Sequence, residues 1–132
     1  MQVQEQCSDT AHISVKTILV VEDDVDIGSF IVLAISQETK YFAYLATDGF
    51  QALKVTHDLK PDLLILDYQL PHMNGIELYD ELQARKELAG IPTIMISAHL
   101  PTQEIAIRKI TGVKKPFELH ELLGTIEGKL AL

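Results

Sequence analysis

Short apolar segments alternate with segments of helical periodicity five times along this chain, and no other feature constrains the fold as strongly. The apolar segments predict strands at residues 15–21, 41–46, 63–66, 93–96 and 110–114. The segments between and after them predict helices at residues 24–39, 50–58, 75–87, 101–109 and 117–130. In the first of these helices, Ile27, Phe30, Ile31 and Ala34 form an apolar stripe. Such alternation, without an internal repeat, is typical of a single doubly wound α/β domain with a mostly parallel sheet and helices on both faces.

The length and composition fit one domain with a full hydrophobic core. The chain has 132 residues, of which 47% are hydrophobic and 23% are charged. Residues 1–14 are polar and show no period, so we interpret them as a tail that precedes a domain at residues 15–132. Cys7, the only cysteine, cannot form an internal disulfide, which is typical of a reducing compartment. Because the sequence has neither a long apolar span nor a secretory leader, we expect a cytoplasmic protein.

The charge balance favours protein partners. The chain carries 19 acidic and 11 basic residues, which gives a net charge of −8 at pH 7. Such a surface repels the phosphate backbone of nucleic acids and the anionic surface of membranes. We therefore expect neither direct nucleic-acid binding nor membrane binding.

Acidic residues follow two of the predicted strands. The first strand ends in Glu22-Asp23-Asp24, and the third is followed by Asp67. In doubly wound sheets ligands bind outside the carboxyl ends of the strands. Carboxylates gathered there repel one another unless a hard cation lies between them, and Mg²⁺ is the obvious candidate, with Mn²⁺ as a substitute.

These residues suit phosphoryl transfer to a carboxylate. Asp67 would be the nucleophile and would form an acyl phosphate. The transferred group then needs its equatorial oxygens neutralised and held. Beside the cation, the hydroxyl of Ser97 and the ammonium group of Lys115 follow the fourth and fifth strands and can serve two of those oxygens. Either residue alone is a weak signal, and the set is strong.

Four short motifs, in this order, resemble those of the receiver domains of bacterial two-component response regulators. They are Val20-Val21-Glu22-Asp23-Asp24, Asp67-x-x-Leu70-Pro71-x-Met73-x-Gly75, Ser97-Ala98 and Lys115-Pro116-Phe117. Each motif is unspecific, but four in order, each at the end of a predicted strand, are highly specific. The resemblance covers residue 16 to about residue 130 and implies a five-stranded parallel sheet with strand order 2-1-3-4-5.

The resemblance implies a signalling switch rather than an enzyme with its own substrate. Asp67 would accept a phosphoryl group from a histidine kinase or a histidine phosphotransfer protein, and a downstream protein would recognise the changed surface. Asp23 would bind the metal directly and Glu22 partly through water, together with Asp67 and the backbone carbonyl of Gln69.

Further residues take roles from the same resemblance. Ser97 and Lys115 would contact the phosphoryl group, and Pro116 is a candidate cis-proline. Asp24 is a third acid, for which a role as helix N-cap is as plausible as a role at the metal. His99, two positions after Ser97, would influence how fast water removes the phosphoryl group, although a solvated loop histidine is the simpler interpretation.

The sequence also departs from the family. Ser97 and Lys115 lie only 18 positions apart, several fewer than the family usually has. Gly112 occupies the position where the family often carries a switch aromatic. The surface formed by the fourth helix, fifth strand and fifth helix is therefore altered, and we expect a monomer or a weak dimer.

Two other classes of function compete with the switch. The departures favour an interaction module that works without phosphorylation, while Asp23, Asp67, Ser97 and Lys115 oppose that interpretation. A phosphatase with an aspartate nucleophile typically carries a second aspartate two positions later, where this chain has Gln69.

Overall fold

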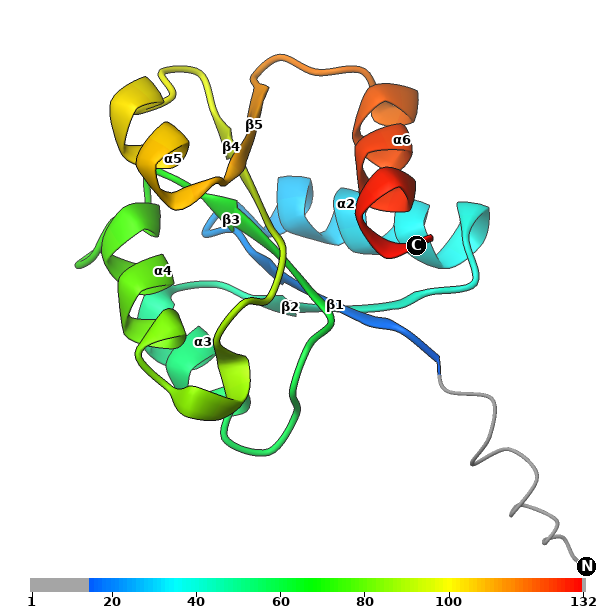
Figure 1. Cartoon of the computed structure of the whole chain (residues 1–132). Coiled ribbons are helices and arrows are strands. Elements are labelled where there is room, and N and C mark those ends of the chain that lie inside the picture. The colour runs from blue at the N-terminus through cyan, green and yellow to red at the C-terminus, as the bar shows by residue number, and fades with distance from the viewer. Residues whose placement is uncertain (1–14, 132) are drawn as a thin grey trace, which may run out of the picture.

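The strands of the computed structural model, which describes residues 15–131, form one parallel sheet (Figure 1). They are β1 (Thr17–Val21), β2 (Phe42–Ala46), β3 (Leu63–Asp67), β4 (Thr93–Ser97) and β5 (Thr111–Lys114). Their order is β2-β1-β3-β4-β5, and every neighbouring pair is parallel. The predicted fold class and strand order are confirmed.

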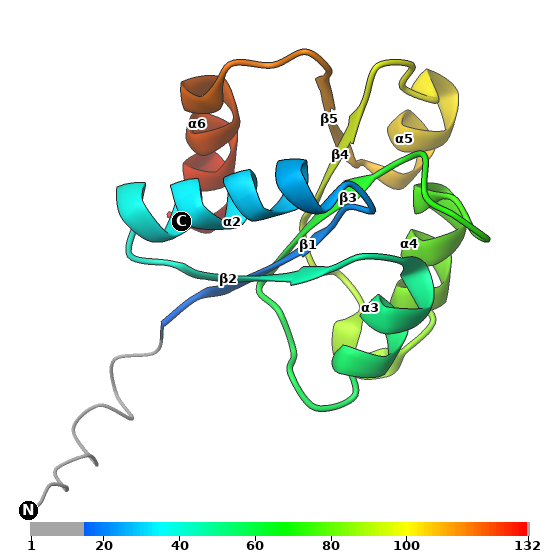
Figure 2. The ribbon, with the colours of Figure 1, turned by 180° about the vertical axis from the view of Figure 1, so that it is seen from behind.

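Helices cover both faces of this sheet, as Figures 1 and 2 show from opposite sides. They are α2 (Val25–Glu38), α3 (Gly49–Val55), α4 (Gly75–Gln83), α5 (Thr102–Arg108) and α6 (Leu119–Leu130), with a 3₁₀ turn η1 (Lys86–Leu88). Helices α2 and α6 lie on one face, and α3, α4 and α5 lie on the other. Within the described residues, none of these helices has the length and apolar character needed to span a membrane.

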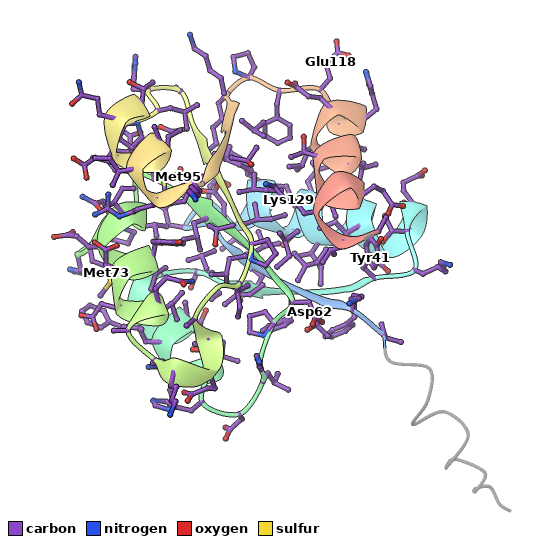
Figure 3. All side chains as sticks on the ribbon, in the orientation of Figure 1. Tyr41, Asp62, Met73, Met95, Glu118 and Lys129 are labelled. Carbon is purple, nitrogen blue, oxygen red and sulfur yellow. The ribbon has the colours of Figure 1, made fainter. Side chains whose placement is uncertain are left out.

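The central strands are buried on both faces, which explains their continuous apolar runs. Alternate side chains enter two separate cores. The core beneath α2 and α6 receives Ile18, Val20, Leu63, Ile65, Ile94 and Ile96, and the opposite core receives Leu19, Val21, Leu64, Leu66 and Met95. Figure 3 shows Met73 and Met95 on the side of α4 and α5, and Tyr41, Glu118 and Lys129 on the side of α6.

Helix α2 begins after the N-cap residue Asp24 and exposes two apolar side chains to solvent. The Asp24 carboxylate accepts the backbone N–H groups of Asp26 and Ile27 at 3.0 and 3.2 Å. The apolar stripe predicted for this helix included Ile27 and Phe30, but these side chains are 36% and 54% exposed. That part of the prediction was wrong, because the sheet-facing side of α2 passes through Ile31 rather than through these positions.

Several element boundaries differ from the predicted ones. Helix α4 was predicted to reach residue 87 but ends at Gln83, since Arg85 adopts an extended backbone (φ −82°, ψ 126°). The chain then forms the 3₁₀ turn η1, which places Leu88 in the core. Strand β1 was predicted from residue 15 but begins at Thr17, the first residue that pairs with β2.

Candidate functional site

Three carboxylates meet at the carboxyl ends of β1 and β3. Val21 pairs with Leu66 in the parallel register, so Glu22 and Asp67 emerge side by side. One carboxylate oxygen from each of Glu22, Asp23 and Asp67 lies within 4.8 Å of the other two. Glu22 and Asp67 are buried, at 3% and 6% exposure, whereas Asp23 is exposed. Two buried acids and one exposed acid therefore share one crevice.

The electrostatics of this crevice disfavour three free negative charges. Burial raises the pKa of Glu22 to about 7, and hydrogen bonding and repulsion by Asp67 act in the same direction. The backbone N–H of Asp24, which donates to Glu22 Oε2 at 3.2 Å, opposes that shift. Additional positive charge at this point would lower the pKa of Glu22 and stabilise the cluster.

Lys115 supplies part of that charge from the end of β5. Its Nζ lies 3.2 Å from Glu22 Oε1 and 3.5 Å from Asp67 Oδ2. Burial disfavours the charged amine, but the attraction of Asp67 and Glu22 outweighs it and raises the pKa of Lys115. The Lys115–Pro116 peptide bond is cis, the isomer that the resemblance implied.

The arrangement suits a hard divalent cation. Carboxylate oxygens are the ligands that Mg²⁺ and Mn²⁺ prefer, and Mg²⁺ is often held by one or two carboxylates and several waters. One lysine does not offset three carboxylates. Glu22, Asp23 and Asp67 therefore fit such an ion by charge, by donor type and by proximity.

The other predicted residues lie around this group. Ser97 is buried at the end of β4, and its Oγ accepts the backbone N–H of His99 at 3.0 Å. The backbone N–H of Gln69 donates to Asp67 Oδ1 at 3.3 Å. Asp24 caps α2 and does not belong to the carboxylate group.

Gly75 has a structural role that the sequence motif alone did not explain. Its N–H donates to the carbonyl of Tyr68 at 2.8 Å. A Cβ at this position would lie only 2.6 Å from the backbone oxygen of Asp67 and 3.0 Å from the Cα of Tyr68. A glycine therefore lets α4 begin against the backbone of Asp67. The signal that could have revealed it is its place in the Asp67–Gly75 motif.

An apolar groove borders the site and was also missed. It has a volume of about 430 Å³ and is lined by Ile27, Ala98, Lys115, Pro116 and Phe117. The helical period placed Ile27 on the apolar stripe of α2, and only the tertiary packing shows it in the same groove as Lys115.

Comparisons with known proteins agree with this geometry. A family model described as "Response regulator receiver domain" matches residues 18–127. The chain belongs to that family. Receiver domains are signalling modules that work with histidine kinases rather than enzymes that turn over a separate substrate.

Curated relatives carry the matching domain within longer proteins. The DNA-binding response regulator MtrA of Mycobacterium tuberculosis is 33% identical over 117 residues, which cover 86% of this chain and 50% of that protein. The sensor histidine kinase TmoS of Ectopseudomonas mendocina is 32% identical over 120 residues, covering 87% of this chain and 12% of that protein. The chain thus spans about half the length of MtrA and a smaller share of TmoS.

Solved structures show the same receiver fold. The chemotaxis protein CheY4 of Vibrio cholerae superimposes with a TM-score of 0.82 at 26% identity. The match covers 89% of this chain and all of that one.

Proposed function

We propose that Asp67 accepts a phosphoryl group in a Mg²⁺-dependent reaction and that this modification switches a surface read by another protein. The observation that carries the proposal is the group formed by Glu22, Asp23 and Asp67 with Lys115 beside it. A nucleophilic carboxylate, a place for a cation and a fixed ammonium group are the parts that phosphoryl transfer to an aspartate requires.

The proposed transfer starts from a phosphohistidine on a partner protein. A carboxylate oxygen of Asp67 attacks phosphorus in line, the new P–O bond forms, and the P–N bond breaks with its electron pair leaving on the imidazole. Bound Mg²⁺ would supply positive charge for the phosphoryl oxygens, with Glu22, Asp23, Asp67 and the Gln69 carbonyl as its proposed ligands. Lys115 neutralises a second oxygen, and the Ser97 hydroxyl donates to a third.

Water later attacks the acyl phosphate and restores the carboxylate, which resets the switch. His99 stands two positions after Ser97, and its backbone N–H is already bonded to the Ser97 hydroxyl. We propose that its side chain influences the access of that water.

The phosphodonor, a histidine kinase or a histidine phosphotransfer protein, would dock over the groove beside Lys115. Ile27, Pro116 and Phe117 line this groove, and Phe30, 54% exposed, extends the apolar surface along α2. An apolar contact here would place a donor histidine over Asp67 without requiring a basic surface on this acidic chain. Docking at the rim of the site is what in-line transfer requires.

The same proposal includes the location, the partners and the oligomeric state of the protein. Phosphotransfer with a kinase would take place in the cytoplasm, and the receiver would work through a downstream protein without touching nucleic acid or membrane. The net charge of −8 supports that choice. A monomer or weak dimer is expected, and sedimentation with and without a phosphoryl mimic tests it; a tight dimer without the mimic would contradict it.

A second candidate function is a receiver-fold interaction module that works without phosphorylation. Gly112 at the position of the usual switch aromatic favours it. The close approach of Lys115 to Asp67 and Glu22 favours the phosphoacceptor instead.

Intact-protein mass after incubation with acetyl phosphate separates the two candidates. We expect a gain of one phosphoryl group that requires Mg²⁺, disappears in Asp67→Asn and persists in Asp58→Asn, which removes an exposed acid from a loop. No gain in the wild-type protein, with or without Mg²⁺, would contradict the phosphoacceptor and favour the interaction module.

A further inference from the structure

Gly112 leaves a space on β5 that two aliphatic side chains fill. A Cβ at this position would lie 2.9 Å from Leu100 Cδ1 and 2.9 Å from Ile105 Cδ1, closer than real side chains pack. Leu100 precedes α5 and Ile105 belongs to it. The absence of a side chain at residue 112 therefore leaves room for the tips of Leu100 and Ile105 against β5.

Helix α5 has few other anchors. None of its own residues is buried, and among them Ile105 packs against the core, flanked by Leu100 before the helix and by the buried Ile110 after it. At its far end Arg108 bonds Asp80 of α4 through two contacts of 2.8 Å each, between partly exposed side chains. Elements with few buried contacts open and shift at low free-energy cost.

Leu100 is also linked to the proposed phosphoryl site, formed by Asp67, Ser97 and Lys115, through a short series of hydrogen bonds and peptide units. The Ser97 hydroxyl accepts the N–H of His99, the residue next to Leu100. The Ser97 carbonyl accepts the N–H of Lys115 at 2.9 Å. A change in the direction of the Ser97 hydroxyl therefore acts on His99, and through one peptide unit on Leu100.

We propose that Leu100 couples the phosphoryl site to α5, an inference that rests on the proposed phosphorylation of Asp67. In the unphosphorylated protein Leu100 packs over Gly112. When Ser97 turns to donate to the phosphoryl group, the segment after it is drawn along, Leu100 leaves Gly112 and α5 shifts. A shallow hollow of about 360 Å³, lined by Leu100 and the residues that follow it through Glu104, gives the side chain room to move.

The coupling works in both directions, because linkage between two states is reciprocal. Gly112→Ala places a methyl group against the tips of Leu100 and Ile105 and so disfavours the unphosphorylated packing. This variant is expected to resemble the phosphorylated form at α5 before any ligand is added. Leu100→Ala removes the coupling side chain and is expected to separate α5 from the site.

Hydrogen exchange of the full chain in Mg²⁺, with and without beryllofluoride as the phosphoryl mimic, tests this coupling. In the wild-type protein the mimic is expected to change the exchange of Thr102–Arg108. Leu100→Ala is expected to lose that change while still gaining one phosphoryl group from acetyl phosphate. Ile107→Ala is the matched control. Ile107 lies on the same helix, its side chain is 74% exposed, and none of the atoms nearest to Gly112 belongs to it.

Each outcome decides the proposal. A full change at α5 in Leu100→Ala, or no change at α5 in a wild-type protein that accepts the phosphoryl group, overturns it. If Leu100→Ala already exchanges freely at α5 without the mimic, Gly112→Ala decides: a reduced response supports the coupling, and a response equal to that of the wild type overturns it. A wild-type protein that accepts no phosphoryl group would instead refute the proposed function.

Discussion

The central strands and the β5 edge of the same sheet are held in very different ways. All five residues of β3 and of β4 are buried, whereas β5 buries only Val113 and α5 buries none of its residues. Asp67 and Ser97 stand at the ends of the two fully buried strands. Residues that must hold a fixed geometry thus sit on the most rigid part of the fold, while a lightly anchored segment beside them is free to respond.

The largest expected difference between these regions is in core packing. Leu64→Ala empties a fully packed position on β3 and should lower the free energy of unfolding by about 2–5 kcal/mol. Ile107→Ala on α5 should change it by no more than about 0.5 kcal/mol, because its side chain is 74% exposed. Urea unfolding measures both. An equal loss of unfolding free energy in the two variants would contradict the difference in packing between β3 and α5.

The next effect concerns pH in the metal-free protein. The folded state raises the pKa of Glu22 from an ordinary value of 4.5 to about 7, so in that window it binds more protons than the unfolded state. Stability linked to Glu22 is therefore present below pH 4.5 and is lost as pH rises toward 7.

Glu22→Gln should remove this loss, so that its stability relative to the wild type increases from pH 5 to pH 7.5. Urea midpoints across that range measure the difference, with Glu121→Gln, an exposed acid on α6, as the control. A difference between Glu22→Gln and the wild type that does not vary with pH would contradict the assigned cause. Saturating Mg²⁺ should raise the stability of the wild type more than that of the variant.

A smaller effect is expected at the metal itself. Lys115 competes with a cation for Glu22 and Asp67, so Lys115→Met should bind Mg²⁺ severalfold more tightly while accepting the phosphoryl group more slowly. Isothermal titration measures the first change and intact mass the second. Lys114→Met is the matched control, because the neighbouring lysine is exposed on β5. Weaker Mg²⁺ binding in Lys115→Met would show that the lysine organises the site rather than competing in it.

The smallest expected effect is at the far end of α5. The Arg108 guanidinium holds the pKa of Asp80 below its usual range, and this contact ties α5 to α4. Arg108→Ala should speed hydrogen exchange within Thr102–Arg108 and leave the urea midpoint nearly unchanged, and Gln103→Ala, an exposed change on the same helix, should do neither. A midpoint that falls together with α5 protection would mean that α5 unfolds with the core.

The same contrast explains what could be predicted from the sequence. Buried strands carry strong apolar runs, so β3 and the place of Asp67 at its end were predicted from the pattern alone. The outward turn of Ile27 and Phe30 was not, because the apolar stripe of α2 does not reveal how the helix is rotated on the sheet. The packing of Leu100 against Gly112 was not predicted either, because it depends on contacts between segments that are distant in the sequence.

The most direct test of the account is to locate the phosphoryl group on the chain. Borohydride reduces an acyl phosphate to the alcohol, so treatment of the acetyl-phosphate-labelled protein followed by peptide mass spectrometry marks the modified residue. We predict a Mg²⁺-dependent conversion of Asp67 alone. Conversion at Asp23 or Asp24 with Asp67 unchanged would contradict the assignment of Asp67 as the acceptor, and so would the absence of any converted residue.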